Sequence, residues 1–225
     1  MNFTAIVFDF DYTLADSSPG VIKSIDYALR VLGLPAAPDE AICRTIGLSL
    51  EEALVRLAGE EARPLAPEFH RLFIAKADLV MAPCTTVYDG VGDLLAALRG
   101  RGLRVGIVSS KYRRRIETVL GRDGLLGYVH TIVGGEDDVA LKPDPEGLQE
   151  VMRRLATEPC ATLYVGDSIV DAQTAARAGT PFVAVLTGTT PAEAFAQYPS
   201  LAIVPRVGDV LPLVTGRDGA GGAGA

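Results

Sequence analysis

The stretch TAIVFDFDYTLADSS, Thr4 to Ser18, decides the fold of this 225-residue chain. Its apolar run, Ala5 to Phe8, has the composition of a buried strand and ends directly in Asp9, with Asp11 two residues later. In an extended chain, residues i and i+2 face the same side, so both carboxylates are predicted to point into one small volume. At about 5 Å and an effective dielectric of about 20, their repulsion would cost roughly 3 kcal/mol. The pair therefore needs a compensating group.

Short apolar runs like this one recur along the chain, with helical patterns between them. Strands that alternate with helices indicate right-handed crossovers and a mainly parallel sheet. We therefore predict an α/β fold with a Rossmann-like sheet covered by helices on both faces. The five predicted strands are Ala5–Phe8, Leu103–Val108, Thr131–Val133, Thr162–Val165 and Phe182–Leu186.

The interval between the first two strands is too long for a single crossover and contains helical pattern only. It includes an apolar stripe at helical spacing and a capping box, Ser49 with Glu52. We predict a helical domain, residues 17–82, inserted into an α/β core formed by residues 1–16 and 83–215. The Gly/Ala-rich residues 216–225 are predicted to be a disordered tail.

Composition limits the partners. The formal charge of −7 and a pI near 4.9 disfavour binding to nucleic acid. No apolar run approaches the roughly 18 residues that a membrane span needs, so we expect no membrane association. Cys43, Cys84 and Cys160 fit no zinc or redox spacing and are predicted to be free thiols. We expect a cytoplasmic protein.

Polar side chains follow the predicted strands at the points where they end. Ser109 and Ser110 follow the second strand, Asp167 follows the fourth with Asp171 four residues on, and Lys142 precedes a helix. The carboxyl ends of parallel strands share one edge, where ligands bind, so these groups are expected to converge. Clustered carboxylates without His or Cys favour Mg²⁺. The lysine, the hydroxyls and a helix N-terminus suit a phosphate that arrives with the metal.

This combination of groups suits hydrolysis of a phosphate ester. One carboxylate can attack phosphorus in line and form an aspartyl-phosphate. A second carboxylate beside it can protonate the leaving alcohol and then deprotonate water. Asp9 and Asp11 supply such a pair, and the metal with the phosphate would offset their repulsion.

These residues resemble the haloacid dehalogenase-like superfamily of phosphohydrolases, and within it the phosphoglycolate phosphatase-like members with a helical cap. Its four motifs are present in order: Asp9-Phe10-Asp11-Tyr12-Thr13-Leu14, Ser109, Lys142-Pro143, and Gly166-Asp167 with Asp171. The resemblance implies that Asp9 is the nucleophile and Asp11 the general acid/base. It also implies that Mg²⁺ is held by Asp9, Asp167 and the Asp11 backbone carbonyl.

The remaining roles also follow from the resemblance. Ser109 and Lys142 would hold the phosphoryl oxygens. Asp171 would either support the metal without binding it directly or orient Lys142. The inserted helices match a cap that closes over the site. In this cap, CRTIGLSLEEAL resembles a loop directed at the active site, which makes Arg44 and Gly47 candidates for substrate contact. The chain departs from the family at Tyr12, where Gly is usual.

Several functions remain open. The first candidate is a Mg²⁺-dependent phosphatase of a small phosphorylated metabolite such as phosphoglycolate, with pyrophosphate, nucleotide or sugar phosphates as alternatives. A phosphomutase is disfavoured because PGVIK lacks a hinge histidine. A non-enzymatic relative that binds metal or phosphate would have lost an essential carboxylate, and none is lost. The sequence leaves monomer and homodimer open. We assign no catalytic role to His70 or His130 and expect residues 113–115 to be a solvated helix face.

Overall fold

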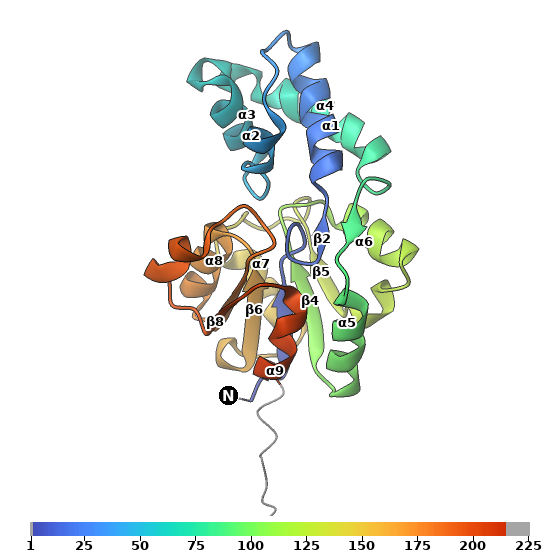
Figure 1. Cartoon of the computed structure of the whole chain (residues 1–225), viewed down its shortest axis with the longest axis vertical. Coiled ribbons are helices and arrows are strands. Elements are labelled where there is room, and N and C mark those ends of the chain that lie inside the picture. The colour runs from blue at the N-terminus through green and yellow to red at the C-terminus, as the bar shows by residue number, and fades with distance from the viewer. Residues whose placement is uncertain (1, 215–225) are drawn as a thin grey trace, which may run out of the picture.

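A computed structural model describes residues 2–214, which form one six-stranded sheet with helices on both faces and a group of helices above it (Figure 1). The strands are all parallel, in the order β5-β4-β1-β6-β7-β8. Their bounds are β1 Ala5–Phe8, β4 Arg104–Val108, β5 Thr131–Val133, β6 Thr162–Gly166, β7 Phe182–Val185 and β8 Ala202–Val204. The five predicted strands are confirmed to within one residue, and β8 was not predicted. The predicted tail, residues 216–225, lies outside the described residues.

The central strand β1 is buried on both faces. Ile6 and Phe8 pack into one apolar core, while Ala5 and Val7 pack into the other. This alternation explains the uninterrupted apolar run, because neither face of the strand meets water. The first core is covered by α5 (Val91–Gly100), α6 (Arg113–Arg122) and α9 (Leu211–Val214), and the second by α7 (Glu146–Arg154) and α8 (Ile169–Ala178).

The inserted segment forms four helices: α1 (Ser18–Val31), α2 (Asp39–Cys43), α3 (Leu50–Ala58) and α4 (Ala66–Val80). They share an apolar core of their own that includes Ile25, Leu54 and Phe69. The predicted capping box begins α3: the Ser49 hydroxyl accepts a hydrogen bond from the Glu52 backbone N–H at 3.2 Å. Short 3-10 helices span Glu60–Leu65, Leu126–Tyr128, Pro159–Ala161, Ala192–Gln197 and Val207–Val210.

A small ribbon joins the helical insertion to the sheet domain. The two short strands β2 (Ala15–Asp16) and β3 (Thr86–Val87) pair antiparallel at the points where the chain enters and leaves the insertion. The entry strand begins only four residues after Asp11, so the attachment lies beside the candidate catalytic residues. This ribbon was not predicted.

Two expectations from composition can be compared with the structure. Cys43, Cys84 and Cys160 are free, as predicted. Among the described residues, no helix combines the length and the apolar character needed to cross a membrane.

We predict that Gly106→Ala destabilises the protein by about 1–3 kcal/mol, because the core cannot accept an added methyl group. A Cβ at Gly106 in β4 would lie 2.4 Å from Val151 Cγ1 and 3.2 Å from Leu155 Cδ1 of the covering helix region. The control is Gly100→Ala at the end of α5, where an added Cβ meets nothing within 4 Å. Urea unfolding should give an unchanged or slightly higher stability for the control. Equal stabilities of the two variants would contradict this packing.

Candidate active site

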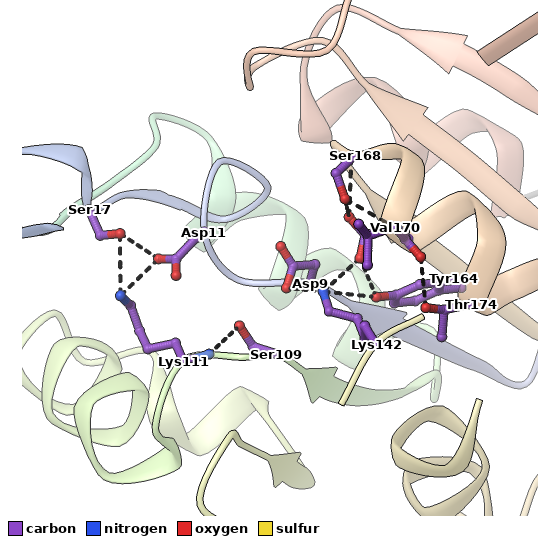
Figure 2. Close-up of polar contacts among 11 residues, drawn as sticks. Asp9, Asp11, Ser17, Ser109, Lys111, Lys142, Tyr164, Ser168, Val170 and Thr174 are labelled. Atoms are coloured by element: carbon purple, nitrogen blue, oxygen red, sulfur yellow. Dashed lines mark hydrogen bonds and ion pairs between the residues drawn. The ribbon is translucent and has the colours of Figure 1, made fainter. Parts of the chain in front are cut away.

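The second aspartate of the first motif lies in a turn that begins at Phe10. Strand β1 ends at Phe8, and the Asp9 N–H still donates to the Val165 carbonyl at 2.9 Å. The chain then folds back, because the N–H groups of Leu14 and Ala15 both donate to the Phe10 carbonyl, at 2.9 and 3.1 Å. The chain reverses direction directly after Asp11, which pairs with Ala15 in an isolated bridge, and the two carboxylates have different partners (Figure 2).

Asp11 lies in a buried cluster with a lysine that sequence reasoning missed. The Lys111 Nζ atom is 3.1 Å from Asp11 Oδ1 and 3.3 Å from the Ser17 hydroxyl. Ser17 in turn donates to Asp11 Oδ1 at 2.6 Å. The available signal was the placement of Lys111 two residues after Ser109, at the carboxyl end of a buried strand. The cluster fixes the orientation of the Asp11 side chain.

Asp9 shares the second lysine with Asp171. Lys142 Nζ donates to Asp9 Oδ1 and to Asp171 Oδ1, at 2.7 Å each, and the Lys142 side chain is 5% exposed. Burial opposes its charge, but the two carboxylates outweigh burial and raise the pKa of Lys142 above its usual value, so it stays cationic. The sequence predicted Lys142 at this edge, and the contact with Asp171 matches one of the two roles implied for that residue.

Asp171 is held by the start of helix α8. Its carboxylate accepts hydrogen bonds from the Ser168 backbone N–H at 3.1 Å, the Ser168 hydroxyl at 2.5 Å and the Tyr164 hydroxyl at 2.7 Å. Burial would raise the pKa of Asp171, but Lys142 and these hydrogen bonds outweigh it and hold the pKa below its ordinary value. Asp171 is therefore an ionised anchor for Lys142.

Asp167 follows β6 and is buried against glycine backbone. A Cβ at Gly188 would lie only 1.8 Å from Asp167 Oδ2, so the close approach of these segments requires a glycine there. Burial, followed by the charges of Asp171 and Asp9, raises the pKa of Asp167 well above its usual value. Its carboxylate lacks the lysine partner that Asp9, Asp11 and Asp171 each have.

The carboxylates could hold a metal ion. One oxygen from each of Asp9, Asp167 and Asp171 lies within 4.8 Å of the others. Burial is the largest cause that raises the pKa of Asp9 to about 7, despite the opposing effect of Lys142. Among residues 2–214, the four buried carboxylates, including that of Asp11, pair with Lys111 and Lys142 alone, which leaves a formal surplus of two negative charges. An all-oxygen site with this surplus suits a hard divalent cation.

The predicted phosphate-binding groups lie at the same edge of the sheet. Ser109 follows β4, is 5% exposed, and its hydroxyl accepts a hydrogen bond from the Lys111 backbone N–H at 3.2 Å. Ser110 lines a cavity that also contacts Asp11 and Lys111. The two serines therefore lie next to the acidic cluster, as the topology argument predicted.

The cavity, of about 610 Å³, lies between the sheet domain and the helical insertion. Gly47, one of the two candidate substrate contacts, is part of its lining. The other candidate, Arg44, does not line it: its side chain is 59% exposed and pairs with Glu40 at 2.5 Å. His70 of α4 does line the cavity, where its Nε2 atom is 3.4 Å from the Tyr112 hydroxyl.

Tyr12 adopts the backbone conformation for which the family's usual glycine is suited. Its φ is +59°, in the left-handed region that non-glycine residues rarely occupy. The Thr187 hydroxyl donates to the Tyr12 carbonyl. Tyr12 is 9% exposed and lies beside Cys43 in α2 and Ser18 in α1. Tyr12 thus packs between the sheet domain and the insertion.

An ion-pair cluster connects the insertion to the sheet domain. Asp78 of α4 accepts from Arg115 Nη2 and Arg114 Nη2 of α6, each at 2.7 Å, and Arg115 also donates to the Ile74 carbonyl at 3.3 Å. The Arg115 side chain is 7% exposed. The expectation of a solvated helix face is therefore wrong at Arg115, because α4 covers that part of α6.

Comparisons with known proteins agree with this architecture. The family model for haloacid dehalogenase-like hydrolases matches residues 6–185. Phosphoglycolate phosphatase from Salmonella typhimurium is 32% identical, over 94% of this chain and 92% of that protein. Phosphoglycolate phosphatase from Escherichia coli K12 is 31% identical, over 92% of this chain and 90% of that protein.

Solved structures give the same result. A protein from Bacteroides fragilis described as a haloacid dehalogenase-like hydrolase superposes with a TM-score of 0.89 at 39% identity, covering 93% of this chain and all of that one. The chain belongs to the haloacid dehalogenase-like hydrolase family, which confirms the resemblance drawn from its motifs. Within that family it is a phosphoglycolate phosphatase-like member of the phosphoric monoester hydrolases.

We predict that Asp78→Ala lowers the free energy of unfolding by about 1–2 kcal/mol, because the buried Arg115 loses its partner. The same variant should speed thermolysin cleavage in the linkers around residues 15–17 and 82–87, since the insertion is held less firmly. The matched control is Glu68→Ala on the same helix, whose pair with Arg71 is exposed on both sides. The control should stay within about 0.5 kcal/mol of the parent. Equal effects of the two substitutions would argue against the Asp78 cluster as a connection.

Proposed function

We propose that this chain is a Mg²⁺-dependent phosphatase that hydrolyses a small phosphorylated metabolite through an aspartyl-phosphate on Asp9. The observation that carries the proposal is the buried Asp9 carboxylate, which contacts Lys142 and shares a potential cation site with Asp167. A candidate nucleophile, its lysine partner and a candidate metal site would thus lie together at one sheet edge. A binding protein would have no need for an aspartate in each of these positions.

The metal would be held by Asp9 and Asp167, with the Asp11 backbone carbonyl as the third protein ligand implied by the family. When bound, Mg²⁺ supplies charge neutralisation for the carboxylates and for the oxygens of a phosphate. The excess of buried negative charge supports this assignment, because a divalent cation would balance it.

The protein groups would act in two steps. A carboxylate oxygen of Asp9 attacks phosphorus in line, forming an Asp9 O–P bond as the bond from phosphorus to the ester oxygen breaks. Asp11 would enter this step in its protonated form and give that proton to the departing oxygen, and the alcohol leaves. Asp11 then takes a proton from a water molecule that attacks phosphorus, which releases phosphate and restores Asp9. Ser109, Ser110 and Lys142 would hold the phosphoryl oxygens throughout.

The relatives named phosphoglycolate phosphatase make phosphoglycolate the first substrate to test. Nucleotide and sugar phosphates and pyrophosphate remain alternatives that the same phosphoryl-transfer groups would serve. The helical insertion, residues 17–82, would act as the cap, because it closes one side of the cavity that reaches Asp11. We also retain the prediction of a cytoplasmic enzyme.

We predict that Asp9→Asn abolishes hydrolysis of p-nitrophenyl phosphate in the presence of Mg²⁺, with a loss of roughly 10³-fold or more. An amide in place of the carboxylate cannot form the covalent intermediate. The control, Asp123→Asn, changes an aspartate that pairs with Arg122 on the surface and should leave activity unchanged. Both variants should show near-parental circular dichroism. Undiminished turnover by Asp9→Asn would exclude the proposed nucleophile.

We further predict that Mg²⁺ raises the Tm more at about pH 8 than at about pH 5.5. The pKa of Asp9 is about 7 in the fold against an ordinary 3.8, so the folded protein binds this proton more tightly than the unfolded chain. Without metal, the stability contributed by this proton is present at low pH. It is lost as the pH rises from 3.8, the ordinary pKa, to about 7, the pKa in the fold. Mg²⁺ replaces the proton, and its stabilising effect therefore grows with pH.

Differential scanning fluorimetry of the full chain measures this effect. Asp167→Asn should remove most of the Mg²⁺-dependent shift, whereas Asp123→Asn should retain it. A shift that is equal at both pH values, or that survives in Asp167→Asn, would contradict the assignment of the metal site.

A further inference from the structure

We infer that the substrate is a phosphate monoester of a carbon-rich alcohol, larger and less charged than glycolate, whose body occupies the cavity between the sheet domain and the insertion. This inference rests on the proposed phosphatase function and concerns the leaving group of the same reaction. It is drawn from three features of the cavity: its size, its apolar wall and the pairing of its charged residues.

The cavity begins at the candidate acid/base residue and extends into the insertion. Asp11, Ser110 and Lys111 line it on the side of the sheet domain. Its volume of about 610 Å³ lies within the range of roughly 300–1,000 Å³ that is typical of sites enclosing drug-sized ligands. A two-carbon glycolate group would leave most of this space to water. An ester with a longer carbon skeleton would fill it while its bridging oxygen stays near Asp11.

The wall on the insertion side is mainly aliphatic and aromatic. Its side chains come from α1, the loop after α2, α3 and α4, so four separate segments contribute apolar surface to one space. They include Val21, Ile25, Ile46, Leu50, Phe73 and Ile74. Apolar surface that faces a ligand cavity is stabilised when a ligand removes it from water. This wall therefore favours an apolar leaving group.

The cationic residues of the lining already have carboxylate partners. Arg63 pairs with Glu60 and with Glu51, and Glu51 itself lines the cavity. Arg115 donates through Nε and Nη2 to Asp78, and Lys111 pairs with Asp11. The carboxylate of phosphoglycolate would have to compete with one of these groups and would also meet the negative charge of Glu51. The wall thus disfavours an anionic leaving group.

One uncharged polar contact spans the cavity. The Tyr112 hydroxyl at the start of α6 and His70 Nε2 of α4 lie 3.4 Å apart, and both residues line the space. A hydroxyl and an imidazole can each donate or accept a hydrogen bond. They suit a single hydroxyl or carbonyl on an otherwise apolar alcohol, and they would orient it without requiring charge.

The test is a series of n-alkyl phosphates, ethyl, butyl and hexyl, compared with phosphoglycolate under saturating Mg²⁺. The leaving alcohols in the series have similar intrinsic reactivity, so differences in kcat/KM report contacts with the cavity. We expect kcat/KM to rise with chain length, by up to about fourfold for each methylene that becomes buried. We also expect hexyl phosphate to exceed phosphoglycolate.

A matched pair of variants on α3 locates the effect. Leu50 lines the cavity, whereas Leu57 packs against the core of the insertion outside the lining, and both are partly buried. Leu50→Ala should lower the ratio of kcat/KM for hexyl over ethyl phosphate by about threefold or more. Leu57→Ala should leave that ratio at the parental value, even if it lowers the Tm.

The outcomes separate this inference from the function on which it rests. Flat kcat/KM along the series, with phosphoglycolate preferred and with hydrolysis still dependent on Mg²⁺ and Asp9, would overturn the inference and leave the phosphatase intact. If the protein hydrolyses none of the esters, p-nitrophenyl phosphate included, both the inference and the proposed phosphatase function would be overturned. A chain-length effect that Leu50→Ala and Leu57→Ala reduce equally would also overturn it, because the effect would not arise in the cavity.

Discussion

The imbalance of buried charge at the carboxyl edge of the sheet is the constraint on which the rest of the structure depends. Asp9, Asp11 and Asp171 have lysine partners, while Asp167 has none, and all four are less than 10% exposed. Carboxylates in such surroundings are costly unless a cation compensates them. A divalent cation at this edge would compensate the surplus of negative charge.

The topology brings these groups together and also connects them to the insertion. Strand β1 lies between β4 and β6, so the sheet order changes direction at the strand that ends in Asp9. The chain enters the helical insertion immediately afterwards, and Ser17, which precedes α1, hydrogen-bonds Asp11. Movement of α1 relative to the sheet domain would therefore change the position of Ser17 and its hydrogen bond to Asp11. If the insertion acts as the proposed cap, this contact would link its closure to the candidate acid/base residue.

Sequence reasoning succeeded where local pattern is decisive. The buried strands could be predicted because parallel strands covered on both faces consist of unbroken apolar runs. Asp9 and Asp167 follow two of these runs directly. Strand β8 was missed because it is a three-residue edge strand with partly exposed side chains. Lys111 and Arg115 were missed for a different reason. Their partners lie far away in the sequence: Asp11 and Ser17 for Lys111, and Asp78 for Arg115. The local sequence distinguishes Lys111 only by its position two residues after Ser109, and it does not distinguish Arg115 from a solvated arginine.

The same limitation explains why substrate preference could not be inferred from the loop around Arg44. An arginine in a cap loop suggests a contact for an anionic substrate, but whether its charge is available depends on its neighbours. Arg44 pairs with Glu40 at the surface, and Arg63, which does reach the cavity, is held by two glutamates. Charge counted along the sequence therefore overstates the charge that a ligand meets. Apolar side chains need no charged partner, so the polarity of the cavity wall depends only on which side chains face the cavity. In this chain, apolar side chains from four segments of the insertion do so.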